Sequence, residues 1–186
     1  MSKSKEPPQP TCQETKIKGT LTERGVKITD KQRMDEFKAK GYGIDENGGL
    51  LLNFYETLHL LDKGLILVVD EKGGEIDFQQ LLQAAEKTDK NAWAKYMVYR
   101  DLRSRGYVVR EGFGMSVDFR VYERGEYGRD AAKYLVISLQ EGKPITIEEL
   151  VQIMRQCQSL KKELILAVMS RRGEIVYYSV SQLTLP

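Results

Sequence analysis

Residues 95–134, KYMVYRDLRSRGYVVREGFGMSVDFRVYERGEYGRDAAKY, decide the fold of this chain. The stretch opens inside a helical pattern that Gly106 ends. Two strands are predicted after it, at 107–111 and 116–124, separated by a glycine-containing turn. Apolar and polar residues alternate in the second strand, which is typical of a strand with one buried face. Tyr122 stands near the end of that strand, beside a loop, where functional residues are common.

Downstream of this stretch the pattern predicts one strand, one helix and two further strands, at 133–139, 146–162, 163–169 and 174–183. The helix carries a capping box, because Thr146 precedes Glu149 by three positions. The second half of the chain is therefore predicted to run helix, three strands, helix, two strands.

Upstream the pattern predicts a hairpin, two helices, a strand and a third helix, at 16–29, 34–43, 50–64, 65–70 and 78–87. Residues 1–15 are rich in Pro, Lys, Ser and Gln, which predicts a disordered tail. The likeliest boundary lies at 88–91, where Asp89 or Asn91 can cap the next helix, which starts at residue 92. We therefore expect an α/β (α+β) chain of two small domains, 16–88 and 89–186.

The composition limits the functional classes to which the chain can belong. The chain has 186 residues, of which 41% are apolar and 30% charged, and its net charge is +2. No apolar run approaches the roughly 20 residues that cross a bilayer, and no secretory signal opens the chain. Cys12 and Cys157 are far apart, so we expect no disulfide and a cytoplasmic protein. The sole histidine, His59, is predicted to pack in a helix, and we expect neither a metal site nor a cofactor.

Three residues offer phosphate chemistry, each with a plainer alternative. Tyr122 could be a reactive phenol or an ordinary strand tyrosine. Lys162 could bind phosphate, or it could be a solvated lysine that complements the helix dipole. Arg155 lies seven residues earlier, about two turns up the same predicted helix face, and could also be a surface ion-pair partner. The cluster Arg100, Arg103 and Arg105 could track phosphates or form a solvated helix face.

Four pieces of sequence, in order, resemble the archaeal tRNA-splicing endonucleases. They are YMVYRDLRSRGYVV (96–109), DFRVYERG (118–125), Arg155 and Lys162 followed by LILAV (164–168), and IVYY (175–178). The similarity is good over about 91–180 and weaker, though in the same order, over 50–85. The resemblance implies a nuclease-like C-terminal domain with a mixed sheet and flanking helices.

In that family a tyrosine, a histidine and a lysine cleave RNA without metal. The resemblance places the tyrosine, taken as general base, at Tyr122 and the lysine, which stabilises the phosphorane, at Lys162. It places the histidine, the general acid, at Ala131, with Ala132 as the alternative. The implied products carry a 2′,3′-cyclic phosphate and a 5′-hydroxyl. The resemblance also makes Arg155 a base-stacking residue, although the family's second stacking arginine falls near Ser179.

The alanine leaves two explanations: a natural non-catalytic subunit, or a catalytic subunit whose histidine has been replaced. Structural subunits of the family carry an acidic loop where this chain has Ser170-Arg171-Arg172-Gly173-Glu174. The basic loop favours a catalytic-type subunit. Arg124 and Lys133, which flank the predicted site, are added as RNA-binding candidates.

The resulting prediction is a tRNA-intron endonuclease subunit that acts on precursor tRNA at bulge–helix–bulge junctions. It is expected to work with a second endonuclease subunit, as a heterotetramer or a homo-oligomer, and away from membranes. The alternatives are a structural subunit that scaffolds an active partner, and an RNA- or protein-binding domain that kept the fold but lost the chemistry.

Overall fold

The computed structural model describes residues 16–112 and 117–183, so the predicted tail at 1–15 lies outside it. The N-terminal half forms a six-stranded sheet in the order β3-β4-β2-β1-β5-β6. Only the β1–β5 pair is parallel. The strands are β1 (Ile17–Thr22), β2 (Gly25–Ile28), β3 (Ile44–Glu46), β4 (Gly49–Leu52), β5 (Ile66–Val69) and β6 (Glu75–Ile76). The helices are α1 (Lys31–Ala39), α2 (Phe54–Asp62) and α3 (Phe78–Thr88).

The C-terminal half forms a five-stranded sheet in the order β11-β10-β9-β8-β7. Its strands β9 and β10 run parallel, and the other neighbours are antiparallel. The strands are β7 (Val108–Glu111), β8 (Phe119–Tyr122), β9 (Tyr134–Gln140), β10 (Glu163–Met169) and β11 (Ile175–Val180). The helices are α4 (Ala92–Ser104) and α5 (Ile147–Ser159). The α+β fold and the predicted order of these seven elements are confirmed, whereas the domain boundary at 88/89 stays a prediction.

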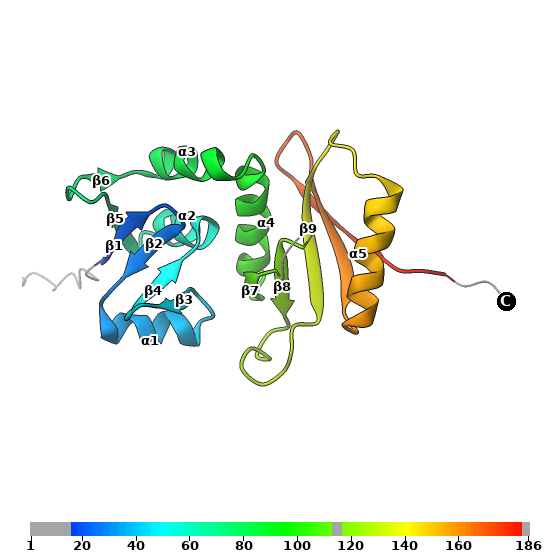
Figure 1. Cartoon of the computed structure of the whole chain (residues 1–186), viewed down its shortest axis with the longest axis horizontal. Helices are drawn as coiled ribbons and strands as arrows, with labels where there is room; N and C mark the ends of the chain where they lie inside the picture. Colours follow the sequence, from blue (N-terminus) through cyan, green and yellow to red (C-terminus); the bar gives the residue numbers. More distant parts are fainter. Residues whose placement is uncertain (1–15, 113–116, 184–186) are drawn as a thin grey trace, which may run out of the picture.

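Helix α4 lies between the two halves (Figure 1). It packs against α2 and α3 on one side and against the C-terminal sheet on the other, so its apolar residues are buried around most of the helix. Helix α5 covers the opposite face of that sheet, where Ile153 and Cys157 pack on Leu135 and Leu164. The C-terminal sheet is thus enclosed by one helix on each face.

Three helix boundaries differ from the sequence predictions. The helix predicted at 50–64 begins only at Phe54, because Leu50 and Leu52 lie buried in strand β4 and Asn53 caps α2 in a capping box with Glu56. Helix α1 begins and ends earlier than the predicted 34–43, and the helix predicted at 146–162 ends at Ser159. The short strands β3 and β6 were not predicted.

The expected cap at the start of α4 is also wrong in detail. Asn91 stands at the N-cap but makes no capping bond with its side chain. Its Nδ2 instead donates to the carbonyl oxygen of Ser138, 2.8 Å away in strand β9. Asp89 accepts a bond from the backbone N–H of Asn91 (2.8 Å) and pairs with Lys95. These side chains therefore tie α4 to its surroundings instead of capping it.

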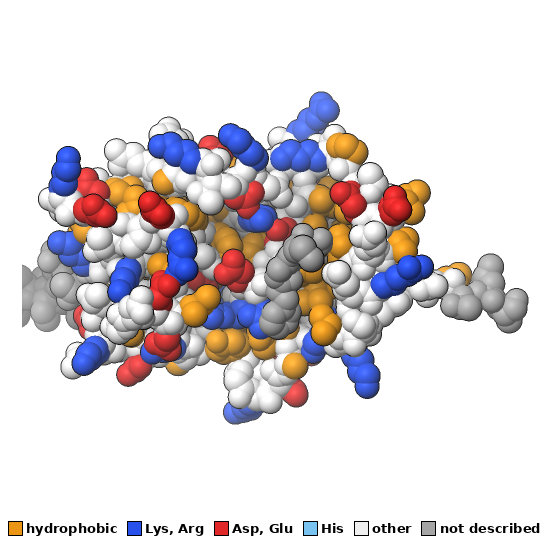
Figure 2. Space-filling model, in the orientation of Figure 1, with side chains coloured by type: hydrophobic (Ala, Val, Ile, Leu, Met, Phe, Trp, Pro, Cys, Tyr) orange, Lys and Arg blue, Asp and Glu red, His pale blue; other side chains and the backbone are white. Residues whose placement is uncertain are grey.

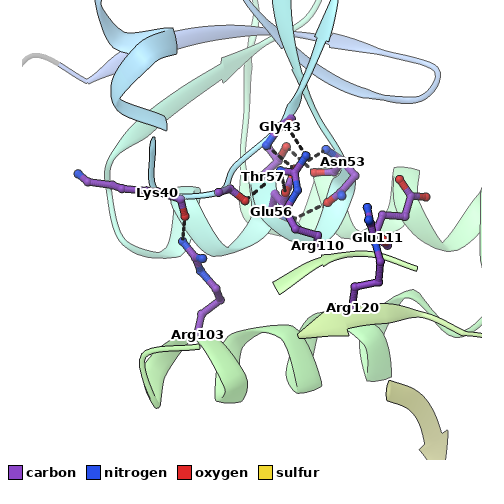
Figure 3. Close-up of polar contacts among 10 residues, drawn as sticks. Lys40, Gly43, Asn53, Glu56, Thr57, Arg103, Arg110, Glu111 and Arg120 are labelled. Atoms are coloured by element: carbon purple, nitrogen blue, oxygen red, sulfur yellow. Dashed lines mark hydrogen bonds and ion pairs between the residues drawn. The ribbon is translucent and has the colours of Figure 1, made fainter. Parts of the chain in front are cut away.

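Two arginines of the C-terminal half fasten it to the N-terminal half (Figure 3). Arg110 donates to the carbonyl oxygens of Gly41 (2.9 Å) and Gly43 (2.7 Å). Arg103 donates to the carbonyl oxygen of Lys40 (3.0 Å), and its guanidinium carbon lies 4.1 Å from the ring centre of Tyr42. The loop before β3 is therefore held by charged hydrogen bonds from both α4 and β7.

Glu56 lies buried beneath this contact, with 1% of its surface exposed. Its Oε2 accepts from the N–H groups of Gly43 (3.1 Å) and Asn53 (3.2 Å), and its Oε1 lies 3.5 Å from Nη1 of Arg110. Burial raises the pKa of this carboxyl from 4.5 to about 7, although Arg110 opposes the shift. The carboxyl is therefore expected to titrate near neutral pH.

Glu56→Gln removes this titration and keeps an oxygen for both N–H donors. The pKa of the Glu56 carboxyl rises from 4.5 to about 7 when the chain folds. Glu56 therefore contributes its full stabilisation below pH 4.5, and this stabilisation is lost as the pH rises through 7. The stability of Glu56→Gln relative to the unaltered chain should therefore rise by up to about 3 kcal/mol between about pH 5 and about pH 8. Urea unfolding of both chains across this range measures the difference.

His59 makes the stability depend on pH in the opposite direction, so Glu56→Gln has to be compared with the unaltered chain at each pH. Burial lowers the pKa of His59 from 6.5 to about 4, and its contribution is lost as pH falls through that window. The histidine is packed against the rings of Tyr42 and Tyr99, as predicted from the sequence. A stability difference that stays flat with pH would contradict the assignment to Glu56.

In the part of the chain that the structure describes, no helix is long and apolar enough to cross a membrane. Figure 2 shows acidic and basic side chains interspersed over one face of the molecule. That pattern agrees with the small net charge of +2.

Candidate active site

The pairing of β8, β9 and β10 brings three predicted site positions to one edge of the C-terminal sheet, namely the end at which β8 stops and β9 and β10 begin. Val121, Tyr134 and Glu163 lie opposite one another in register. The next residues outward along these strands are Tyr122, Lys133 and Lys162. Since neighbouring strands are about 4.8 Å apart, the backbones of Tyr122 and Lys162 are separated by about 10 Å.

The three positions share a face of the sheet as well as an edge. Two residues further in, Leu135 of β9 and Leu164 of β10 pack under α5. Because side chains alternate along a strand, Lys133 and Lys162 belong to the same face as these leucines. Tyr122, next to Lys133 in the register, belongs to it too. The backbones of Tyr122, Lys133 and Lys162 therefore lie side by side at the end of this face, beyond α5.

Lys162 is positioned by the turn that ends α5. Its N–H donates to the carbonyl oxygen of Cys157 (2.9 Å), and the N–H of Lys161 donates to Gln158 (2.9 Å). This is the Schellman pattern, and it requires Lys161 to adopt a left-handed backbone with φ of 54°. Lys162 therefore stands just before strand β10 and does not continue the helix, so the expected helix face shared with Arg155 is wrong.

The left-handed backbone of Lys161 generates a stability prediction. An L-residue pays roughly 1–2 kcal/mol in this conformation, partly offset in glycine by a larger unfolded-state entropy. Lys161→Gly should therefore stabilise the fold by about 0.5–1 kcal/mol, whereas the matched Lys161→Ala should not. Chemical denaturation of the three proteins checks this, and equal midpoints for glycine and alanine would contradict it.

Arg155 and Lys162 carry free cationic groups. Arg155 is exposed on α5, and Lys162 is partly exposed just after it. Among the described residues, neither side chain has an ion-pair partner. Both charges are therefore available to a phosphate or a base, as their predicted roles require.

Tyr122 lies beside the loop that carries Ala131. Its ring meets that of Tyr127 edge-on, with ring centres 5.1 Å apart. Ala131 is exposed, whereas Ala132 is buried with 5% of its surface accessible. An imidazole at 131 would reach solvent and substrate, but one at 132 would have to displace packed atoms. This exposure favours Ala131 over Ala132 as the position of the predicted acid.

Lys133 is less free than the sequence indicated. Its Nζ pairs with Glu123 Oε1 at 2.8 Å, and the hydroxyl of Tyr134 donates to the same oxygen at 3.0 Å. The hydrogen bond to Glu123 raises the pKa of Lys133, so the side chain stays cationic but partly neutralised. Arg124, the other predicted RNA-binding residue, places its guanidinium carbon 5.9 Å from the ring centre of Tyr107. Sequence reasoning missed Glu123 and both tyrosines, which only the tertiary fold brings together.

The arginine cluster of α4 does not form a line of free charges. Arg103 binds the N-terminal half, and Arg105 pairs with Asp101 at 2.7 Å. Arg100 lies 5.7 Å from the ring centre of Tyr96. A phosphate track along this helix would therefore compete with existing contacts. Within the described residues no three His, Cys, Asp or Glu side chains gather in a group that could hold a metal ion.

Two family models match the chain and together span most of it. The model described as tRNA intron endonuclease, N-terminal domain, matches residues 17–82. The model described as tRNA intron endonuclease, catalytic C-terminal domain, matches residues 92–177.

Individual relatives extend over the same range. A tRNA-splicing endonuclease of Methanococcus vannielii is 36% identical over 169 residues, which are 91% of this chain and 96% of the relative. One from Hyperthermus butylicus is 35% identical over 173 residues, covering 87% and 95%. One from Methanococcoides burtonii is 31% identical over 157 residues, which are 83% of this chain but 44% of that longer relative.

Proposed function

Because the chain belongs to the tRNA intron endonuclease family, we propose that it is a catalytic-type subunit that lacks its general acid. Its substrate is precursor tRNA, cut at bulge–helix–bulge junctions. The observation that carries the proposal is the single row of Tyr122, Lys133 and Lys162 at one sheet edge, with exposed Ala131 just beyond it.

The proposed reaction is an internal transfer at phosphorus that needs no metal. The deprotonated phenolate oxygen of Tyr122 takes the proton of the 2′-hydroxyl, while the 2′-oxygen attacks the phosphorus. The bond from phosphorus to the 5′-oxygen then breaks, and the leaving oxygen needs a proton, which a histidine at position 131 would donate and Ala131 cannot. Lys162 stabilises the charge on the phosphorane between these transfers. The products carry a 2′,3′-cyclic phosphate and a 5′-hydroxyl.

The remaining proposed contacts come from exposed cations. Arg155 stacks on an unpaired base, because a planar guanidinium can lie flat on a π-face. Arg124 and Lys133 approach the phosphates on either side of the cut, although Lys133 must share its charge with Glu123. Recognition on this scheme reads shape and splayed bases more than sequence.

A second subunit completes the proposed enzyme. Strand β11 is an edge of its sheet and exposes Val176 and Tyr178, about half of whose surfaces are accessible. An exposed apolar edge strand of this kind is expected to pair with another chain. We place the chain in a heterotetramer, with a homo-oligomer as the simpler possibility. Its turn at 170–174 carries exposed Arg171 and Arg172, which suits a subunit that receives a partner's acidic loop.

The missing acid also supports a competing function, that of a structural subunit. In this case the chain only scaffolds an active partner, and Tyr122 and Lys162 have no catalytic role. The two functions differ in what restores cleavage: a histidine in this chain, or a partner added to it.

Ala131→His is expected to restore cleavage of a bulge–helix–bulge RNA by about 10²–10⁴-fold, the usual contribution of a general acid. Single-turnover cleavage in a chelator measures the rate, and end-group analysis identifies the cyclic phosphate. The matched control is Ala131→Gln, which adds bulk without an acid. Adding Tyr122→Phe to the histidine variant should abolish the gain. If histidine changes nothing while an added partner supplies full activity, the chain is the structural subunit.

A further inference from the structure

A small cleft opens on the other face of the same sheet edge. It has a volume of about 220 Å³ and lies between the end of α4 and the sheet. Its apolar floor comes from neighbouring strands, at Val121, Val136 and Ile165. Strand β7 starts opposite Tyr122, so α4 ends and the cleft opens at the edge that carries the candidate site. The cleft is smaller than the roughly 300–1,000 Å³ of typical ligand pockets, and so suits one ring system.

Three tyrosines form its walls, and each has a cation near its ring. Arg124 lies 5.9 Å from the ring centre of Tyr107, Lys133 lies 5.1 Å from that of Tyr134, and Arg105 lies 5.6 Å from that of Tyr177. Aromatic walls offer π-faces to a base, and cations at the rim offer charge to the phosphates beside it. This combination complements a nucleic-acid strand better than an apolar peptide.

Two of the tyrosines are held in place before any ligand binds. The hydroxyl of Tyr177 donates to Asp101 Oδ2 at 2.7 Å, and that of Tyr134 donates to Glu123 Oε1 at 3.0 Å. Each carboxylate also pairs with a rim cation, Arg105 or Lys133, so its negative charge is already compensated. The rings are therefore oriented without leaving an unpaired acid to repel phosphate.

We propose that this cleft binds one unpaired base of the RNA substrate, from a nucleotide close to the scissile phosphate. The inference rests on the proposed function, and adds a base-binding subsite built from Tyr107, Tyr134 and Tyr177. The phosphate lies at the Tyr122–Lys162 edge, and the strand turns around that edge to place the base against the tyrosines. Because every base has a π-face, the subsite selects an unpaired nucleotide and tolerates its identity.

The test measures binding of the full-length chain, with Ala131 in place, to bulge–helix–bulge RNA. Each unpaired nucleotide is replaced in turn by 2-aminopurine, whose fluorescence falls when it stacks on an aromatic ring. We expect quenching at one position. Tyr107→Leu should relieve it and weaken binding by about 5- to 150-fold. Tyr107→Phe, which keeps the ring, should bind like the natural chain.

Ile147→Ala is the control, because it removes an exposed apolar side chain at the start of α5, outside the cleft. It should leave affinity and quenching unchanged, and thermal unfolding verifies that each variant folds. If Tyr107→Leu proves unstable, Ile165→Phe, which fills the cleft, should cause the same loss. Equal affinities for Tyr107→Leu and Ile147→Ala, with cleavage still restored by Ala131→His, would overturn the subsite alone. Absence of any binding to bulged RNA, and of cleavage by that variant, would overturn both proposals.

Discussion

The parallel pairing of β9 with β10 is the constraint on which the candidate site depends. Two consecutive parallel strands need a crossover, and α5 supplies it. The crossover returns the chain to the end of the sheet where β9 begins. Lys162, just before β10, therefore lies beside Lys133. The antiparallel strand β8 ends at that same edge with Tyr122. Sheet topology thus brings a tyrosine and a lysine forty residues apart in sequence to the same end of the sheet, and the left-handed turn at Lys161 sets where the lysine lies.

The sequence predicted the C-terminal half well, because its elements carry strong local signals. The capping box at Thr146 is present, and β8 alternates as its apolar pattern indicated. The N-terminal half was harder, since the run Leu50–Leu52 fits a buried strand and a helix equally, and pairing with β2 and β3 decides between them. The end of α5 could not be predicted, because it depends on Lys161 adopting a left-handed backbone conformation that is usual for glycine.

The positions of the site residues could be predicted, but their surroundings could not. Tyr122, Ala131 and Lys162 were found through sequence resemblance, and their catalytic roles stay predictions. The ion pair between Glu123 and Lys133, and the three tyrosines of the cleft, come from segments as distant as Tyr107 and Tyr177. No local pattern marks such groups. Arg103, predicted either to track phosphates or to be solvated, binds the carbonyl oxygen of Lys40, a partner that only the tertiary fold supplies. Arg105 pairs with Asp101, four residues earlier in the chain.

On the proposed function, the sheet edge is a working RNA-cleaving centre apart from one proton donor. Ala131 is exposed, so free imidazole can reach the place that the proposed acid would occupy. The most direct measurement adds imidazole to the unaltered chain and follows metal-free cleavage of bulge–helix–bulge RNA. The account predicts a rate that rises with imidazole concentration, yields a 2′,3′-cyclic phosphate, and vanishes in Tyr122→Phe. A rate unaffected by imidazole, or equal with and without the Tyr122 hydroxyl, would contradict it.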